Sequence, residues 1–515
     1  NNNTAVGAYT LEDNTTGTAL VAVGAGALKN NTTADNNVAV GLDALMTNTT
    51  GDRNVAVGHN ALTANTTADG NTAFGYRALN ANTTAEVNVA VGFDAMLSNT
   101  TGTTNVAVGA LALKSNTTAA QNTAIGYSAL EANTTGAANT GMGFEALHAN
   151  TTAANNVGIG WRALYTNTTG TGNTAVGVQA LDALTTGNYN TGVGYDSGTA
   201  LTGSRNTLIG HEAGYGLAAA DDCVAVGKNT LQGASDADDN TAIGYGALQA
   251  CTTGYSNTAV GMTALVSLTT GFQNTCVGQQ AGITLTTAVR NTFIGEDAGY
   301  AHTTGADNTY IGKNAGSGST TGVSNVFVGK DAGDTITTGG YNVFIGQNGT
   351  PASVDTTYAI NIGHDLTSIG ASYITLGRGS GINRIYNQYT SDAAWTRVSD
   401  ERYKKDITTA TDLGLSFINE LRPVTFKWKA NSEVDKSMPD YDADATVADN
   451  TDKHYGLIAQ EVKAAMDKLS ISDFGGWHEI PDGVKQQGIA ESMFIYPLIK
   501  AVQELSAEIK KLKGE

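Results

Sequence analysis

Hydrophobic and polar residues recur along most of this chain with a period of seventeen. Each unit is close to N-T-A-V-G-x-x-A-L-x-x-N-T-T-G-x-x, and the chain carries about 22 copies. One step is sixteen residues, to Asn206, and Cys223 takes the next Asn place. The other Asn at the first place are Asn3, Asn37, Asn54, Asn71, Asn88, Asn105, Asn122, Asn139, Asn156, Asn173, Asn190, Asn240, Asn257, Asn274, Asn291, Asn308, Asn325 and Asn342. A short fixed period predicts a solenoid whose coils bury their faces on one another.

Within a unit the alternation of "NVAVG" predicts a short strand, in which Val38 and Val40 share one face. Gly41, at the fifth place, provides a turn conformation closed to other residues. The "NTTG" and "NTTA" stretches are typical of polar turns, and equivalent Asn residues stacked in register predict hydrogen-bonded ladders. At roughly 4.8 Å per coil, 22 coils would form a rod about 105 Å long.

The ninth and twelfth places exchange volume along the rod. The ninth place is Leu in early units, such as Leu45, but Gly in six later ones: Gly198, Gly214, Gly282, Gly299, Gly316 and Gly333. In four of those six the twelfth place, usually Asn, becomes apolar: Leu201, Leu217, Leu285 and Ile336. This exchange indicates that both places face the core.

Composition supports a repeat architecture. The 515 residues include 63 Gly and only 5 Pro, with 15% charged and 41% hydrophobic residues. That is too Gly-rich for several close-packed globules and too hydrophobic for disorder. The net charge of −19 disfavours nonspecific nucleic-acid binding, and no apolar run is long enough to span a bilayer. Cys223, Cys251 and Cys276 lack metal-ligand spacing and are interpreted as buried thiols, so no cofactor or metal is expected.

The repeats, in forms such as "NVAVG", "NTAIG" and "NTFIG", resemble the head repeats of trimeric bacterial adhesins and the Asn/Gly repeats of phage tail fibres. The resemblance covers roughly residues 3–377. Because adhesin heads are parallel β-rolls assembled as trimers, the resemblance implies a mainly β, trimeric rod.

An aromatic residue often occupies the sixth place. It is Tyr76, Phe93, Tyr127, Phe144, Trp161, Tyr195 or Tyr245. Such a stripe can stack on sugar rings, but packing between coils or subunits is the preferred interpretation. The repeated "NTT" triplets match a glycosylation acceptor and are interpreted as turns.

A glycan-cutting tailspike would need two well-placed carboxylates. The candidates Asp43, Asp94, Glu145, Asp196, Glu212 and Asp331 recur at the seventh place, which we expect to be exposed and which also carries Arg77, Arg162 and neutral residues. This pattern indicates a variable solvated turn rather than a single active site, so a depolymerase remains the alternative.

The periodicity ends before Ser399. Of the 28 Lys and Arg, 15 lie in the last 117 residues. "LGLSFINELRPVTFKWK" predicts a helix ended by Pro423 and followed by a strand, and "HYGLIAQEVKAAMDKL" a strand or turn entering an amphipathic helix. Spacings of four and three predict a coiled-coil seam at Leu498, Val502, Leu505, Ile509 and Leu512.

Four motifs of this region resemble successive motifs of the endosialidase-type intramolecular chaperone domain. They are "SDERYKKDI", "INELRPVTFKW", "HYGLIAQEV" and "IYPLIKAVQELSAEIKKL". The resemblance implies a C-terminal chaperone that trimerises the chain, templates the β-structure upstream and releases itself by autoproteolysis. By the same resemblance the cut falls between Val398 and Ser399.

A serine hydroxyl is a weak nucleophile, and a lysine amine kept neutral by desolvation can serve as its base. Ser399 and Lys404 match the spacing of the family dyad. Asp400 and Arg402 also match the motif, and we interpret both as holding the loop; Lys405 is interpreted as a solvated charge.

The sequence therefore predicts a solenoid fibre over residues 1–376, a transition segment over 377–398 and an α+β chaperone domain over 399–515 that ends in a coiled-coil helix. In the transition segment, Tyr386 and Trp395 are candidates for packing at a trimer axis. The predicted function is the distal part of a homotrimeric phage tail fibre in the virion. Its expected partners are a host-surface glycan or protein receptor and the upstream tail or baseplate proteins. The alternatives are a glycan depolymerase with the same chaperone, and a fibre of a phage-derived contractile injection particle.

Overall fold

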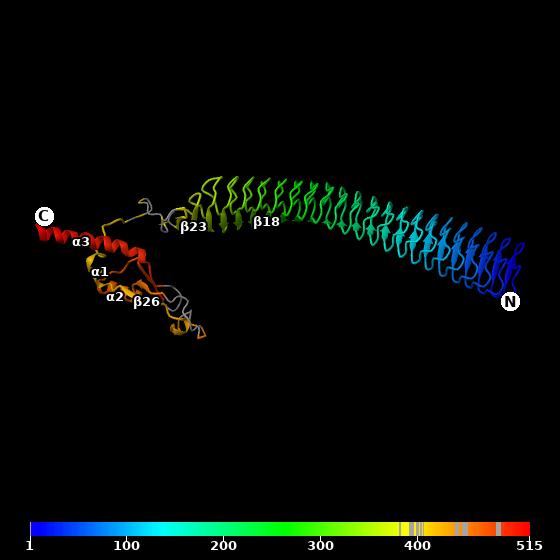
Figure 1. Ribbon diagram of the computed structural model, residues 1–515, viewed down its shortest axis with the longest axis horizontal. Coiled ribbons are helices and arrows are strands. Elements are labelled where there is room, and N and C mark those ends of the chain that lie inside the picture. The colour runs from blue at the N-terminus through cyan, green and yellow to red at the C-terminus, as the bar shows by residue number, and fades with distance from the viewer. Residues whose placement is uncertain are drawn as a thin grey trace. The chain divides into compact units, whose positions relative to one another are not determined.

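The computed structural model describes residues 2–380, 383–390, 396–397, 401, 404, 406–437, 441, 443–444, 452–479 and 486–514. The chain divides into two compact units, Asn1–Ser399 and Asp400–Glu515. In the first unit, short strands and turns wind into a row of similar coils, coloured from blue at the N-terminal end to green and yellow (Figure 1).

Each coil contributes one short strand to a continuous parallel sheet. The strands are β1 (Thr4–Val6), β2 (Val21–Val23), β3 (Val38–Val40), β4 (Val55–Val57), β5 (Thr72–Phe74), β6 (Val89–Val91), β7 (Val106–Val108), β8 (Thr123–Ile125), β9 (Thr140–Met142), β10 (Val157–Ile159), β11 (Thr174–Val176), β12 (Thr191–Val193), β13 (Thr207–Ile209), β14 (Val224–Val226), β15 (Thr241–Ile243), β16 (Thr258–Val260), β17 (Thr275–Val277), β18 (Thr292–Ile294), β19 (Thr309–Ile311), β20 (Val326–Val328), β21 (Val343–Ile345) and β22 (Ile360–His364). Val38 pairs with Val55, one full period later. The predicted solenoid of about 22 coils is confirmed.

Two asparagine ladders run along the inside of the coils, as the sequence predicts. At the first place, the Asn37 Oδ1 accepts the backbone N–H of Asn54 (2.8 Å), and the Asn37 Nδ2 donates to the carbonyl of Gly51 (2.8 Å). At the twelfth place, the Asn48 Nδ2 donates to the same Gly51 carbonyl (3.0 Å) and to the Asn31 Oδ1 (3.2 Å). Both ladders therefore meet on one carbonyl per coil, and the buried amides of these Asn residues gain partners there.

The corner after each strand depends on glycine. Gly41 has a φ of +138°, and a Cβ there would lie 2.4 Å from the carbonyl oxygen of Gly58. The predicted need for glycine is thus both conformational and steric. Left-handed backbone also recurs at the seventh and ninth places, as at Asp43 (φ +54°) and Leu45 (φ +52°).

The two faces of each strand differ in a way that the alternation alone does not reveal. Val38 and Val40 do share a face, but it is the partly exposed outer face, whereas Ala39 is fully buried. Inside the coil, Ala39 is joined by Ala44 and Leu45, which are also fully buried. Because Leu45 takes most of the interior volume, the strand contributes only a small side chain to the core.

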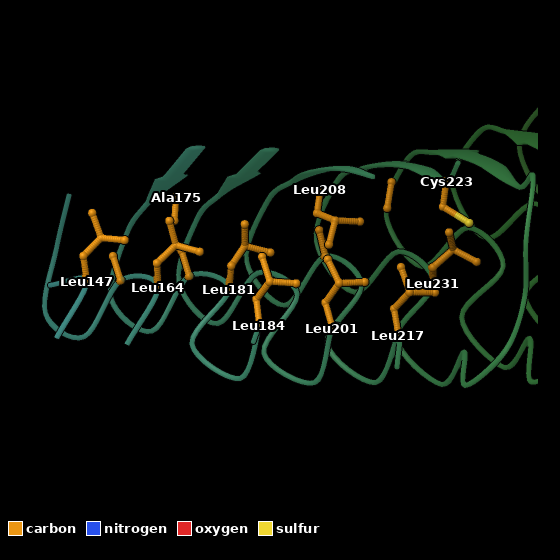
Figure 2. Packing of buried hydrophobic residues seen from close by; sticks show 14 of the residues in the cluster. Leu147, Leu164, Ala175, Leu181, Leu184, Leu201, Leu208, Leu217, Cys223 and Leu231 are labelled. Atoms are coloured by element: carbon orange, nitrogen blue, oxygen red, sulfur yellow. The ribbon is translucent and has the colours of Figure 1, made fainter. Parts of the chain in front are cut away.

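The ninth and twelfth places both face the core, as predicted, and the third place joins them. Figure 2 shows Leu147, Leu164 and Leu181 in one row, and Leu184, Leu201 and Leu217 in another. In the coil of Leu208, which projects from the third place, the ninth place is Gly214, and a Cβ there would lie 2.9 Å from the Leu208 side chain. The core volume is therefore shared among three places.

Aromatic residues take over the third place in the last coils. Phe293 and Tyr310 stack with ring centroids 4.6 Å apart, and Tyr310 and Phe327 at 4.8 Å. Phe344 continues the row, at 5.4 Å from Phe327. All four rings are fully buried. Glycine at the ninth place accompanies the first three: a Cβ at Gly299 would lie 2.4 Å from the Phe293 ring.

After the last regular coils the sheet turns antiparallel. Strand β23 (Tyr373–Arg378) still pairs in parallel with β22, only fourteen residues on at Ile360 and Ile374. Strands β24 (Arg384–Gln388) and β25 (Thr396–Arg397) then add in antiparallel order. Tyr386, on β24, packs edge to face against Tyr373 at 6.0 Å. Trp395 lies outside the described residues.

The second unit is small and mixed α+β. Its elements are α1 (Leu415–Glu420), β26 (Val424–Phe426), the 3-10 helix η3 (Asn431–Glu433), β27 (His454–Gly456), α2 (Ala459–Lys468), β28 (Trp477–Glu479), β29 (Gln487–Ile489), the 3-10 helix η4 (Glu491–Phe494) and α3 (Ile495–Lys513). β26 pairs with β27 and β28 with β29, both antiparallel. The predicted helix before Pro423, the strand after it, and the strand and amphipathic helix of "HYGLIAQEVKAAMDKL" are all confirmed.

Candidate functional site

The predicted cleavage site follows directly after β25. Arg397 pairs with Ile385 on β24, so the chain on the upstream side of the site is held by the large sheet. Val398, Ser399, Asp400 and Arg402 lie outside the described residues, as does Lys405. The spatial relation of the predicted nucleophile to its base therefore stays a prediction.

Lys404 is the one residue of the predicted dyad within the described part of the chain. Its side chain is exposed, and its backbone N–H donates to the carbonyl of Glu401 (2.9 Å). Asp406, two residues on, adopts left-handed backbone (φ +54°). A lysine serves as a general base when desolvation keeps its amine neutral, so this role requires that another surface cover Lys404.

The helices of the second unit are joined by an aromatic cluster and by a hydrogen bond at the N-terminal end of α1. Phe417 on α1 packs edge to face against Phe474 (5.4 Å), and Phe474 against Phe494 (5.1 Å). The Glu504 carboxylate on α3 accepts the backbone N–H of Leu415 (2.7 Å), one of the N–H groups that the first turn of α1 leaves without a helical partner. This contact fixes α1 against α3.

A charged pair fixes the turn that Pro423 introduces. Arg422 donates from Nε to the Glu461 carboxylate (3.0 Å), joining the chain after α1 to the first turn of α2. The Arg422 guanidinium lowers the pKa of Glu461. Lys468, the last residue of α2, pairs with Glu420, the last residue of α1 (2.7 Å).

An apolar pocket of about 380 Å³ opens beside these helices. It is lined by Ile418, Leu421, Pro423, Tyr455, Gly456, Leu457, Glu491, Phe494 and Leu498. Leu498 also begins the predicted seam of α3, whose other members are exposed along the helix: Val502, Leu505, Ile509 and Leu512. The second unit thus presents one continuous apolar surface from the pocket along α3.

In the rod, the aromatic residues of the sixth place are exposed and stack along the coil direction. Tyr76 and Phe93 lie with ring centroids 5.3 Å apart and nearly parallel, and Tyr127 and Phe144 lie 5.2 Å apart. The Arg162 guanidinium lies 5.1 Å from the centroid of Trp161. Each stacked pair covers one face of each of its rings, which supports packing between coils as a role for these residues.

The seventh place is less exposed than the sequence indicates. Its acidic residues are half-buried, and Asp94 is buried, because this place lies in a tight left-handed turn against the next coil. Arg77 donates to Asp94 (2.8 Å) and Arg162 to Glu145 (3.0 Å). The expectation of an exposed place is therefore wrong, while the interpretation as a structural turn agrees with these ion pairs.

The three cysteines are buried and reduced. The Cys223 thiol donates to the carbonyl of Ala237 (3.0 Å), in place of the amide of the usual Asn, and Cys251 donates to Gly254 (3.4 Å). Burial raises the pKa of Cys223 to about 12 and that of Cys251 to about 11. Within the described residues, no group of three or more His, Cys, Asp and Glu is placed to hold a metal ion, and no helix is long and apolar enough to cross a membrane.

One surface is not among the features predicted from the sequence: the row of fourth-place side chains on the outer face of the sheet. This row is apolar in every coil from β1 to β22, with members such as Val108, Ile209 and Ile345 about two-fifths exposed. The second place beside it carries Val, Thr or Ile and never a charge. The signal was present in the sequence as the unvarying apolar fourth place.

Comparison with known protein families gives a match in the C-terminal part of the chain. Residues 399–471 match the family model described as the chaperone of endosialidase. No curated protein and no solved structure matches the chain. A domain of this family implies autoproteolytic chaperone activity and is typical of phage tail fibres. The chain thus joins a parallel β-solenoid of about 22 seventeen-residue coils to a C-terminal region whose residues 399–471 match the chaperone of endosialidase, which fits a tail fibre or tailspike with a C-terminal chaperone.

Proposed function

We propose that this chain is the distal part of a homotrimeric phage tail fibre that attaches the particle to a host-surface glycan or protein. The observation that carries the proposal is the junction itself: the compact unit that contains the rod ends at Ser399, the residue where the match to the endosialidase chaperone begins. A long rod of repeated coils suits a role in reaching a surface, and a folding domain at its end suits a rod whose coils are difficult to align.

Attachment is tested by binding of the purified protein to host cells and to their isolated surface glycans. We expect saturable binding to one strain range, and loss of binding when cells lack the receptor. Binding to no cell type, including the natural host identified from the genomic neighbourhood, would contradict a role in attachment.

The homotrimer rests on two apolar surfaces that a single chain leaves uncovered. One is the fourth-place row on the outer face of the sheet, and the other is the seam of α3. A contiguous apolar surface of such length is unusual for a monomer and typical of an interface. Light scattering of the uncut Ser399→Ala chain should give three times the 52.8 kDa chain mass, and a monomer mass would overturn this part of the proposal.

For self-cleavage we propose that the Ser399 hydroxyl attacks the carbonyl carbon of Val398 while the Lys404 amine takes its proton. The peptide bond between the two residues breaks, its nitrogen gains a proton and becomes the new α-amine, and an ester joins Val398 to the Ser399 Oγ. Water then hydrolyses the ester, which leaves a Val398 carboxylate and a free Ser399. Since Lys404 is exposed in the single chain, assembly would have to cover it, so cleavage should follow oligomerisation.

The dyad is tested by intact mass spectrometry of freshly expressed protein. Wild type should yield a fragment of residues 399–515 that begins at Ser399. Ser399→Ala and Lys404→Ala should both stay whole yet assemble, and Lys405→Ala is the matched control that should be cut as wild type is. Cleavage of the serine variant at Val398, or a wild type that stays whole after assembly, would show the assignment to be wrong.

The rival function, glycan hydrolysis, is favoured by one observation. Asp182 and Asp196 lie on neighbouring coils, and in each case burial is the main cause of a raised carboxyl pKa. The charge of Asp196 adds to the effect on Asp182. A raised carboxyl pKa is a property that a general acid needs. Release of reducing sugars from host capsule or lipopolysaccharide by wild type, and its loss in Asp182→Asn, would favour the depolymerase over the adhesive fibre.

A further inference from the structure

A corner lies at each end of every strand of the rod. Where both corner residues of a coil are Asp, Glu, Lys or Arg, their charges are opposite. The strand-start corner is the residue just before the first-place residue of each coil, as at Arg290 (φ +55°), and the strand-end corner is the residue just after the fifth-place glycine, as at Glu296. Three coils carry an Asp, Glu, Lys or Arg at both corners. The charges are opposite in all three: Asp222 with Lys228, Arg290 with Glu296, and Asp307 with Lys313.

These opposite charges cannot meet within one chain. The two corners are six residues apart along extended backbone, a separation of about 20 Å. Each residue instead pairs along its own corner row: Arg290 with Asp307 (2.6 Å) and Glu296 with Lys313 (3.0 Å). All four side chains remain about half exposed, so each row still presents its charges outward.

Between the two corner rows lies the apolar outer face of the sheet. In a closed ring of parallel copies that turn this face inward, every strand runs in the same sense around the axis. The strand-end corner of one copy then meets the strand-start corner of the next, at equal height. Under that arrangement Glu296 meets Arg290 of a neighbouring copy, and Lys313 meets its Asp307.

We propose that the strand-start and strand-end corner rows form complementary edges that join neighbouring copies of the chain and fix their register. The inference rests on the proposed homo-oligomeric fibre and names the surface through which it forms. Its partner is a second copy of this chain, aligned in parallel with equal coils side by side.

The charges also discriminate against slipped alignments. The apolar row repeats in every coil, so it would accept a shift of one coil at little cost. A shift in one direction places Arg290 against Lys313, and a shift in the other places Asp307 against Glu296. Like charges at an interface select against wrong alignments, so the non-repeating corner residues supply the register that the repeating row lacks.

The test separates pairing within a chain from pairing between chains. A one-edge variant, Glu296→Lys with Lys313→Glu, keeps an opposite pair along the strand-end row but places like charges against the neighbouring copy. A two-edge variant adds Arg290→Asp and Asp307→Arg and restores opposite charges at every contact. The full-length proteins are compared by the rate at which the assembled oligomer dissociates on heating, at low and at high salt.

We expect the one-edge variant to dissociate about tenfold faster than wild type at low salt, and the two-edge variant to match wild type. In about 1 M salt the difference should shrink, because the Debye length falls to roughly 3 Å. Equal rates for all three proteins, or a two-edge variant no better than the one-edge variant, would overturn the inference while leaving the homotrimer intact. A monomeric wild type would overturn the proposed fibre together with the inference.

Discussion

At the residue scale, the buried side chains of the twelfth place decide how each coil is closed. Asn is the usual choice because its amide donates to two acceptors at once, as Asn48 does to Asn31 and Gly51. His302 occupies this place in the coil of Phe293. Its Nδ1 lies 3.2 Å from the Ser319 Oγ, and its Nε2 lies 3.4 Å from the Asn308 Nδ2. The ring is fully buried among aromatic side chains.

Burial lowers the pKa of His302 from 6.5 to about 4, which makes the last coils sensitive to acid. The folded protein binds this proton less readily than the unfolded chain does. The stability due to neutral His302 is therefore complete above pH 6.5 and is lost as the pH falls towards 4. The full loss is about 3 kcal/mol per chain. Hydrogen exchange at pH 7 and pH 4.5 should show a loss of protection in this coil that His302→Asn abolishes.

His211→Asn is the matched control for this experiment, because His211 lies at the sixth place and is about half exposed. Its removal should leave the pH dependence of exchange unchanged. If His302→Asn loses protection at acid pH to the same extent as wild type, carboxylates elsewhere in the rod cause the effect and the buried histidine does not.

At the element scale, the row of aromatic rings gives the coils nearest the C-terminal end of the rod a different core from the rest. In the coil of Phe327, a Cβ at Gly333 would lie 2.7 Å from the ring, so the large third place and the glycine at the ninth are one packing unit. Other coils have the reverse arrangement, with a small residue at the third place and a large one at the ninth. An example is the coil with Ala175 and Leu181, both fully buried.

We therefore expect Phe327→Ala and Gly333→Leu to destabilise the rod separately and to compensate together. The first leaves a cavity, which typically costs about 3–5 kcal/mol, and the second drives a side chain into the ring. The double variant recreates the arrangement of the coil of Ala175. Thermal unfolding should place it closer to wild type than either single variant. Additive losses in the double variant would show that the two places do not share one volume.

The sequence predicts those parts of the architecture that depend on residues repeated in every coil. The period, the glycine corners and the Asn ladders follow from identical residues at identical places, because a stacked coil must satisfy the same backbone groups each time. The sequence also reveals the exchange between the ninth and twelfth places. It does not reveal that the third place takes part, because whether Ala39 or its valine neighbours face inward depends on how much of the interior Leu45 fills.

At the scale of the whole molecule, the folds of the two units differ in how far they can be predicted from the sequence. Every coil of the rod has nearly the same structure, so the fold of the rod could be predicted from a single unit of the repeat. The second unit is aperiodic, and local patterns predicted only some of its elements, such as the helix before Pro423, and not the paired strands β28 and β29. The contact between Glu504 and the N–H of Leu415 could not be predicted, because it joins residues far apart in sequence. The dyad of Ser399 and Lys404 stays a prediction from resemblance, since its nucleophile lies outside the described residues.

The asparagine ladders have a further consequence, which concerns chemical ageing. Asparagine deamidates when the backbone nitrogen of the following residue attacks the side-chain carbonyl to form a cyclic imide. After Asn37 that nitrogen, on Val38, donates to the carbonyl of Asn54 (2.9 Å), and after Asn48 the nitrogen of Thr49 donates to Thr66 (2.8 Å). Both side chains are themselves held by hydrogen bonds inside the coil. The bonds that align the coils therefore also keep nucleophile and carbonyl apart, so a rod rich in asparagine should deamidate slowly despite its composition.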